Sequence, residues 1–131
     1  MNLDLNMPIL VVDDYATMVK IIRNLLTQIG FTNIDDAHNG SAALAKIKAK
    51  TYGLVLSDWN MDEMTGIELL AQVRADPANA KLPFIMVTAE SKADNIVMAR
   101  QYGVDNYLVK PFTKEALAAK IKQIFASAQA A

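Results

Sequence analysis

Short runs of consecutive apolar residues recur along the chain and alternate with longer amphipathic stretches. The clearest runs are Ile9–Val12, Leu54–Leu56, Phe84–Val87 and Tyr107–Val109. Apolar residues at consecutive rather than alternate positions are typical of strands that are buried on both faces of a parallel sheet. A weaker run, Ile34–Ala37, carries Asp35 and Asp36, and charge of this kind favours an edge strand.

The stretches between these runs have the spacing of amphipathic helices. Apolar residues separated by three or four positions line one side of a helix, because roughly 3.6 residues make one turn. Two such stripes are clear, one after the first run and one near the C-terminus: Met18, Ile22, Leu25 and Ile29, then Leu117, Ile121, Ile124 and Phe125. Strands and helices are therefore predicted to alternate along the chain.

Polar residues and glycines mark the expected ends of the helices. Ser, Thr, Asp and Asn side chains cap helix N-termini, and glycine is favoured just beyond helix C-termini. The N-terminal signals are Asn39, the capping box of Thr65 with Glu68, and the looser pair Ser91 and Asp94. The C-terminal signals are Gly30 and Gly103, and Pro83 stands where a strand begins.

Alternation of strand and helix indicates a parallel sheet with helices on both faces, because crossovers between parallel strands are right-handed. We therefore expect an α/β fold with five strands and five helices. Residues 1–131 are interpreted as one domain with a core of about residues 7–125, without an output domain. The alanine-rich end, Ala126–Ala131, is expected to be a fraying tail.

Composition narrows the classes of protein that fit this fold. A net charge of -1 argues against a nucleic-acid or membrane-surface binder, which usually carries a basic patch or tail. The absence of cysteine excludes thiol chemistry and cysteine-bound metals. The segment Met1–Met7 lacks the basic start and apolar stretch of a signal peptide. We expect a cytoplasmic monomer that binds neither nucleic acid nor membrane.

Polar side chains follow the apolar runs at the points where the strands end. They are Asp13 and Asp14, then Asp58, Thr88 and Lys110. Each alone has an ordinary interpretation as a helix cap, a turn residue or a surface lysine. Ligands of open α/β sheets bind beyond the carboxyl ends of the strands, so all five residues are predicted to converge on one site. Caps and turns give no reason for such a grouping.

The predicted group contains three carboxylates, one hydroxyl and one ammonium. Carboxylates this close repel one another unless a cation intervenes. Oxygen ligands without His or Cys suit Mg²⁺, for which Mn²⁺ can substitute. A metal held by Asp14 and Asp58, together with Lys110, would neutralise charge on a transferring phosphoryl group. Thr88 would donate a hydrogen bond to that group, and Asp58 would be the nucleophile that forms an acyl phosphate.

Four separated segments resemble the receiver domains of response regulators, and more narrowly those of chemotaxis: Val11–Met18, Ser57–Met61, Thr88–Glu90 and Lys110–Thr113. The likeness covers roughly residues 7 to 125, which is almost the whole chain. It implies a doubly wound, flavodoxin-like sheet with the strand order 2-1-3-4-5. It also implies that Asp58 is the phospho-acceptor. The implied Mg²⁺ ligands are Asp14, Asp58 and the backbone carbonyl of Asn60, with Asp13 acting through water.

The resemblance implies further roles outside the metal ligands. Thr88 and Tyr107 would form a switch pair, in which the hydroxyl moves towards the phosphoryl group and the ring turns inward. Lys110 would contact the phosphoryl group and precede a cis peptide bond to Pro111. Two residues, Asn60 and Glu90, would tune the lifetime of the acyl phosphate, for which we expect fairly fast hydrolysis.

Partners follow from the same resemblance. A histidine kinase would donate the phosphoryl group, and a phosphatase is a further candidate partner. The face around Tyr107, with Lys92, Lys120 and Lys122, would bind an acidic segment of the flagellar motor switch. Self-phosphorylation and self-dephosphorylation would be the only activities, so an enzyme with a separate substrate is not expected. Where many receiver domains have Pro, this chain has Asp62, followed by Glu63.

Several alternatives share or replace this chemistry. A phosphate sink and a phosphorelay intermediate would use the same residues, and a non-phosphorylated binding module would use the fold alone. A flavodoxin-type flavin binder needs a hydroxyl- and glycine-rich loop after the first strand, where this chain has Asp13 and Asp14. A phosphatase of the Asp-x-Asp kind needs its aspartates two positions apart rather than adjacent.

Overall fold

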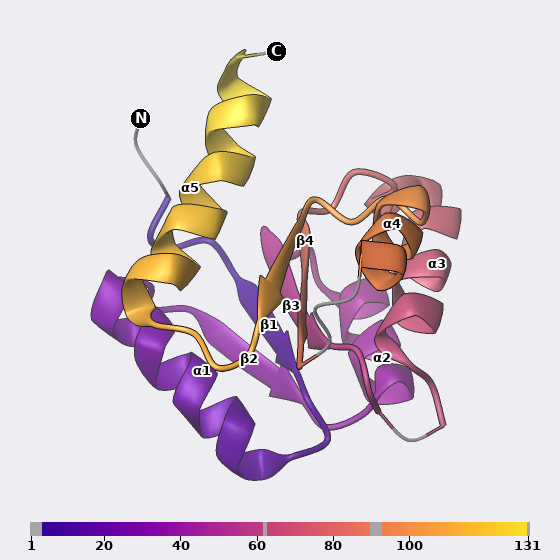
Figure 1. Ribbon diagram of the computed structural model, residues 1–131, viewed down its shortest axis with the longest axis horizontal. Helices are drawn as coiled ribbons and strands as arrows, with labels where there is room; N and C mark the ends of the chain where they lie inside the picture. Colours follow the sequence, from indigo (N-terminus) through magenta and orange to yellow (C-terminus); the bar gives the residue numbers. More distant parts are fainter. Residues whose placement is uncertain (1–3, 62, 90–92, 131) are drawn as a thin grey trace.

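A parallel sheet forms the centre of the molecule. The computed structural model describes residues 4–61, 63–89 and 93–130, and within them the strands lie in the order β2-β1-β3-β4-β5 (Figure 1). The strands are β1 (Ile9–Val12), β2 (Ile34–Ala37), β3 (Leu54–Asp58), β4 (Phe84–Thr88) and β5 (Asn106–Val109). Every neighbouring pair is parallel. The expected order is confirmed, and the charged run Ile34–Ala37 forms an edge strand.

Helices cover both faces of the sheet. They are α1 (Ala16–Ile29), α2 (Gly40–Ala49), α3 (Gly66–Ala75), α4 (Ala93–Gln101) and α5 (Lys114–Ala130), with a short 3₁₀ helix, η1 (Pro77–Asn79). Figure 1 shows α1 and α5 on one side of the sheet and α2, α3 and α4 on the other. The predicted α/β fold with five strands and five α-helices is therefore confirmed in the described part of the chain.

The predicted capping residues hold several helix ends. The Asn39 side chain accepts a hydrogen bond of 2.7 Å from the backbone N–H three residues on, at the start of α2. Thr65 and Glu68 form the capping box of α3. Gly30 and Gly103 have φ angles of 127° and 92°, a region that other residues rarely adopt.

Two further expectations about helix ends are not decided by the structure. Fraying of the end Ala126–Ala131 stays a prediction, and the backbone of α5 is helical as far as Ala130. Alanine has the highest helix propensity of all residues, which explains why the backbone remains helical there. The pair Ser91 and Asp94 cannot be compared, because Ser91 and the Asp94 side chain lie outside the described residues.

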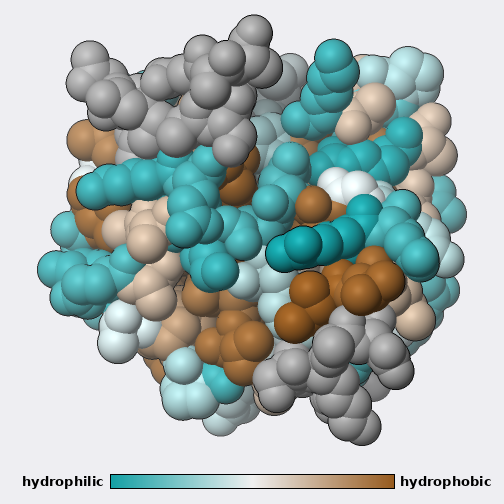
Figure 2. Space-filling model, turned by 45° about the horizontal axis from the view of Figure 1, so that its top comes forward, coloured by the Kyte–Doolittle hydropathy of each residue, from teal (hydrophilic) through white to brown (hydrophobic). Residues whose placement is uncertain are grey.

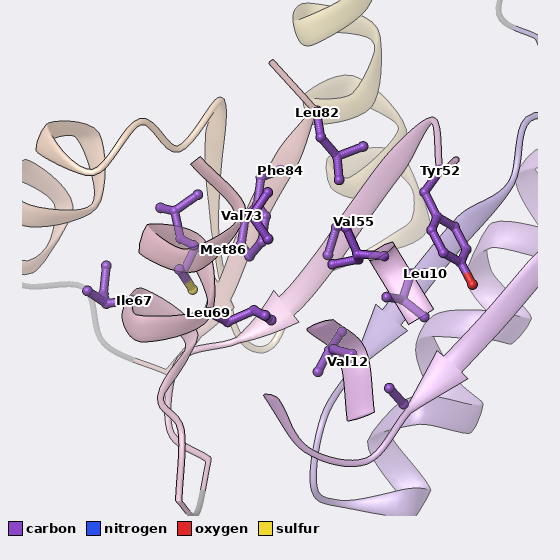
Figure 3. Close-up of a cluster of buried hydrophobic side chains, with 14 of the residues drawn as sticks. Leu10, Val12, Tyr52, Val55, Ile67, Leu69, Val73, Leu82, Phe84 and Met86 are labelled. Atoms are coloured by element: carbon purple, nitrogen blue, oxygen red, sulfur yellow. The ribbon is translucent and has the colours of Figure 1, made fainter. Parts of the chain in front are cut away.

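Side chains alternate between the two faces of each strand, so the sheet separates two apolar layers. Leu10, Val55 and Phe84 face α2, α3 and α4, where Leu69 and Val73 of α3 pack on them (Figure 3). The opposite layer is built from alternate strand residues and from α1 and α5: Ile9, Leu56, Ile85, Ile22 and Leu117. Burial of each large side chain contributes roughly 1.5–3 kcal/mol, so the two layers hold the strand ends in fixed positions.

At their carboxyl ends, two strands extend beyond the apolar runs that predicted them. β3 ends at Asp58 and β4 at Thr88, and both polar residues still pair with the neighbouring strand, Asp58 with Val87 and Thr88 with Val109. An apolar run ends by definition at the first polar residue, whereas the pairing between neighbouring strands continues past it. Both candidate site residues are therefore held in the sheet itself rather than in loops.

The face shown in Figure 2 is mainly hydrophilic, with apolar residues between the hydrophilic ones. The large apolar side chains that are exposed in the described part of the chain are Leu5, Tyr15, Ile21, Val97, Met98 and Tyr102. Among the described residues, no helix has both the length and the apolar character that crossing a membrane requires.

Candidate functional site

The carboxyl ends of β1 and β3 bring two aspartates together. Asp13 follows the last residue of β1, and Asp58 is the last residue of β3. The two strands are neighbours, and Val12 pairs with Ser57. The residue that follows each of them is an aspartate, so Asp13 and Asp58 lie side by side. The Asp13 carboxylate also accepts a hydrogen bond of 2.9 Å from the backbone N–H of Tyr15, which fixes its direction at the start of α1.

Asp14 completes an acidic group at this edge. Asp13, Asp14 and Asp58 each offer a carboxylate oxygen, and these three oxygens all lie within 4.8 Å of one another. Asp13 and Asp58 are only 1% and 7% exposed, whereas Asp14 is open to solvent. The group therefore has a buried wall and an open side through which a ligand can enter.

Lys110 supplies a positive charge to the same group. It follows the last residue of β5, and its Nζ lies 3.0 Å from Asp58 Oδ1 and 3.3 Å from Asp13 Oδ2. The Lys110 backbone N–H donates to the Thr88 carbonyl at 2.7 Å, which continues the pairing of β4 with β5. The peptide bond from Lys110 to Pro111 is cis, as the resemblance implied.

Burial and neighbouring charges shift the proton affinities of this pair. Burial raises the pKa of the Asp58 carboxyl, and repulsion from Asp13 adds to the rise, while the hydrogen bond from Lys110 opposes it. Burial disfavours the charged Lys110, but its contacts with Asp58 and Asp13 outweigh burial, so the Lys110 pKa is raised. Lys110 therefore keeps its positive charge, and this charge favours the ionised form of the neighbouring Asp58 carboxyl.

Thr88 and Tyr107 lie on the next two strands. Thr88 is fully buried at the end of β4, between Asp58 on β3 and Lys110 after β5. Tyr107 lies on β5 opposite Met86 of β4 and is 8% exposed. The structure thus brings the predicted hydroxyl to the edge that carries the carboxylates, with the aromatic residue nearby on the adjacent strand.

The remaining predicted residues lie away from the acidic group or outside the described part of the chain. Asn60 is exposed in the loop after β3, two residues beyond Asp58. Lys120 lies beside β5, because its carbonyl accepts a hydrogen bond of 3.3 Å from the Asn106 side chain. Lys122 instead lines a groove with Leu5 and Gln28, so it lies on the α1 side of α5 rather than beside Tyr107. The residues outside the described part of the chain are Asp62, Glu90 and Lys92.

Sequence reasoning missed the part that Gly66 plays in the site. An added Cβ at this first residue of α3 would lie 2.3 Å from the Asp58 carbonyl oxygen. The Gly66 N–H donates to the Trp59 carbonyl at 2.8 Å, so α3 packs directly on the backbone next to Asp58. A glycine immediately after the cap Thr65 was the available signal, because glycine is a poor helix former and needs a packing reason there.

Comparison with known proteins agrees with this geometry. Residues 9–122 match the family described as the response regulator receiver domain. The chain is 50% identical over 119 residues to the chemotaxis protein CheY of Pseudomonas aeruginosa, covering 91% of this chain and 96% of that protein. It is 46% identical over 123 residues to the chemotaxis protein CheY-3 of Vibrio cholerae, covering 94% and 95%.

Solved structures show the same arrangement. The chemotaxis response regulator CheY4 of Vibrio cholerae superposes with a TM-score of 0.85 at 28% identity, covering 91% of this chain and 98% of that one. A putative response regulator from Chloroflexus aurantiacus gives a TM-score of 0.87 at 27% identity, covering 92% and 98%. The chain belongs to the response regulator receiver domain family.

Proposed function

We propose that this chain is a stand-alone response regulator that accepts a phosphoryl group on Asp58 from a histidine kinase. The observation that carries the proposal is the contact of Lys110 Nζ with Asp58 Oδ1 at 3.0 Å, inside a group that also contains Asp13 and Asp14. This arrangement places a nucleophilic oxygen, a fixed positive charge and a set of hard oxygen ligands at one edge of the sheet.

The carboxylates fit a divalent metal such as Mg²⁺. Three carboxylate oxygens within 4.8 Å of one another carry more negative charge than the single ammonium of Lys110 neutralises. Oxygen donors of this kind suit Mg²⁺ or Mn²⁺, and Asp14 and Asp58 would hold the ion with the Asn60 carbonyl, while Asp13 would act through water. When bound, the metal supplies further positive charge for the transferring phosphoryl oxygens.

The transfer itself exchanges one bond to phosphorus for another. An Asp58 carboxylate oxygen attacks the phosphorus of a phosphohistidine, the new oxygen–phosphorus bond forms, and the nitrogen–phosphorus bond breaks. The electron pair of the broken bond stays on the imidazole nitrogen, which then takes up a proton. Lys110 and the Thr88 hydroxyl would contact phosphoryl oxygens and stabilise their charge.

An apolar groove beside Lys110 offers a surface for the phosphodonor. It has a volume of about 400 Å³ and is lined by Met18, Ile21, Leu25, Ala89, Lys110, Pro111 and Phe112. Because Lys110 belongs to both the groove and the acidic group, a donor protein seated there would approach Asp58 directly. This position supports a protein donor with an apolar surface around its phosphohistidine.

The signal would leave through the face formed by α4, β5 and α5. Relatives at 46–50% identity are named chemotaxis proteins, so we propose phosphorylation-dependent binding to the flagellar motor switch. Tyr107 belongs to β5, Lys120 lies beside that strand, and α4 carries the exposed side chains of Val97 and Met98. A phosphoryl group at Asp58 would draw Thr88 towards it and bias Tyr107 to its inward position.

We also propose that self-phosphorylation and self-dephosphorylation are the only reactions of the chain, with Asn60 and Glu90 setting the lifetime of the acyl phosphate. The protein would act as one domain, as a cytoplasmic monomer, and a phosphatase would be a further partner. Phosphate-sink and relay roles use the same site, so the identity of the partner distinguishes them.

Intact-mass measurement after incubation with a small acyl phosphate tests the chemistry. Wild type should gain one phosphoryl group in Mg²⁺ and none in chelator, and the adduct should be acid-stable and base-labile. Asp58→Asn should gain none, while Asp4→Asn, an exposed aspartate outside the site, should match wild type. A wild-type protein that gains no adduct under these conditions would reduce the chain to a non-phosphorylated binding module.

A further inference from the structure

A contact between two aromatic rings links the acceptor strand to the last strand of the sheet. Trp59 follows Asp58 directly, and its ring lies against that of Tyr107, with centroids 6.3 Å apart and ring planes at 75°. Edge-to-face contact of this kind is one of the geometries that aromatic pairs prefer. Tyr107 is largely buried and Trp59 is half-buried, so the contact is partly shielded from water.

The Trp59 backbone is fixed on both sides. Its N–H donates to the Val87 carbonyl of β4 at 3.2 Å, and its carbonyl accepts the Gly66 N–H at 2.8 Å. An added Cβ at Gly66 would lie 2.9 Å from the Trp59 Cα, so the start of α3 packs directly on this backbone. A rigid backbone therefore presents the indole to Tyr107.

Trp59 lies one residue beyond the end of β3, and its packing places it on the other side of the sheet from the neighbours of Asp58. Trp59 packs on the apolar layer under α2, α3 and α4, which includes Met86 and Tyr107. Val87, opposite Asp58, belongs to the other layer, under α1 and α5. One peptide unit thus connects the acceptor on one face with an aromatic ring on the face that carries Tyr107.

We propose that Trp59 is a positioning residue that couples the phosphoryl site to Tyr107 by direct ring contact, in addition to any effect of Thr88. The inference rests on the function proposed above. The Trp59 ring stabilises the buried position of Tyr107, and by linkage whatever favours that position favours a phosphoryl group on Asp58. Ring contacts of this kind support a coupling of roughly 2- to 10-fold in affinity.

Beryllofluoride with Mg²⁺ is the probe, because it mimics a phosphoryl group on an aspartate, and ¹⁹F NMR measures its Kd without relying on tryptophan fluorescence. Trp59→Leu should raise the Kd roughly 2- to 10-fold, and Trp59→Phe should recover part of the affinity because it retains an aromatic ring. In a Tyr107→Leu background, Trp59→Leu should have no further effect on the Kd. Ring signals of labelled tyrosine should show Tyr107 more exposed in Trp59→Leu.

A matched variant separates coupling from general destabilisation. Leu82 belongs to the same apolar layer but precedes β4, at the opposite end of the sheet from Asp58. Leu82→Ala should lower the free energy of unfolding and leave the Kd of beryllofluoride unchanged. An equal change of Kd in Leu82→Ala and Trp59→Leu would show that loss of packing alone explains both, and would overturn the inference.

Two further outcomes separate this inference from the proposed function. If wild type and Trp59→Leu bind beryllofluoride with the same Kd, or if the effect of Trp59→Leu persists in the Tyr107→Leu background, the coupling through Trp59 is wrong and the phosphoryl site stands. If wild type gives no signal for bound beryllofluoride, the proposed function fails and the coupling fails with it.

Discussion

The guanidinium of Arg74 on α3 donates a hydrogen bond of 2.9 Å to the carboxylate of Asp105, which directly precedes β5. The same guanidinium donates to the carbonyls of Gly103, Asn79 and Leu82, at distances between 2.7 and 3.2 Å. All five of its N–H groups are thereby used. Arg74 thus ties the end of α3 to the segments that precede β4 and β5, at the opposite end of the sheet from Asp58.

Replacing Arg74 with lysine should destabilise the fold. Lysine keeps the charge but has neither the planar fork nor five donors, so partly buried carbonyls would lose their partners. We expect a loss of about 2–4 kcal/mol in the free energy of unfolding, measured by urea denaturation. Arg23→Lys is the matched control, because Arg23 pairs with Asp36 at the surface, and it should cost less than about 1 kcal/mol. Equal effects of the two changes would contradict the assigned role.

Gly66→Ala should damage the site as well as the fold. The new Cβ would meet the Asp58 carbonyl oxygen at 2.3 Å, a contact that is relieved only by movement of the backbone of β3 or of the start of α3. We expect a loss of about 1–3 kcal/mol in stability and a weaker affinity for Mg²⁺, measured by urea denaturation and by titration of Trp59 fluorescence.

Gly53→Ala is the control for this prediction. Its Cβ would first meet the Met7 side chain at 3.0 Å, near the N-terminus and away from the site. Mg²⁺ affinity should remain that of wild type in Gly53→Ala, whatever the change in stability. An unchanged Mg²⁺ affinity in Gly66→Ala would show that the close approach of α3 does not position Asp58.

Much of the site was predictable because parallel strands share one carboxyl edge. Asp13, Asp58, Thr88 and Lys110 each follow or complete a buried apolar run, so the order of runs along the chain was enough to group them. The acidic group and its contact with Lys110 agree with that grouping. Local pattern and topology together determine which residues meet at the edge.

Contacts between distant side chains were not predictable in the same way. Arg74 occupies an ordinary position on an amphipathic helix, and nothing in its neighbourhood in the sequence indicates that it reaches Asp105. The ring contact of Trp59 with Tyr107 joins the residue that follows β3 to a residue on β5, and the whole of β4 lies between these two strands in the sheet. Such contacts depend on helix placement and rotamers, which apolar periodicity does not determine.

Tyr52→Phe should change how stability depends on pH. The buried Tyr52 hydroxyl donates to Asp35 at 2.7 Å. This hydrogen bond, with help from Lys50, lowers the pKa of Asp35, while burial and the same hydrogen bond raise the pKa of Tyr52. We expect Tyr52→Phe to lose about 0.5–1.5 kcal/mol at neutral pH, measured by urea denaturation.

The two shifts set the pH window of that loss. Because the pKa of Asp35 is lowered by folding, its contribution is complete above the unfolded value of about 3.9 and is lost as pH falls through the folded value. The raised pKa of Tyr52 gives a contribution that is complete below about pH 10 and is lost as pH rises towards the folded value. The stability difference between wild type and Tyr52→Phe should therefore be flat from about pH 5 to 9 and shrink in acid.

Tyr102→Phe serves as the control for the pH experiment, because Tyr102 is exposed on the surface after α4. Its stability should follow that of wild type at every pH. A difference between wild type and Tyr52→Phe that stays constant down to pH 2 would contradict the contribution of Asp35.

Lys110→Met should separate metal binding from phosphoryl transfer. The Lys110 ammonium contacts both Asp58 and Asp13, so its removal leaves the carboxylates without their neutralising charge. Mg²⁺ affinity, measured by Trp59 fluorescence, should be retained or increased, because the metal no longer competes with an ammonium. The rate of adduct formation with a small acyl phosphate, measured by intact mass, should fall by roughly 100-fold or more, because the variant lacks a group that stabilises the transferring phosphoryl oxygens.

Lys48→Met, at an exposed position on α2, is the control and should change neither the Mg²⁺ affinity nor the rate of adduct formation. A wild-type transfer rate in Lys110→Met would exclude Lys110 from phosphoryl transfer, whereas loss of Mg²⁺ binding would show that it serves to assemble the carboxylates instead.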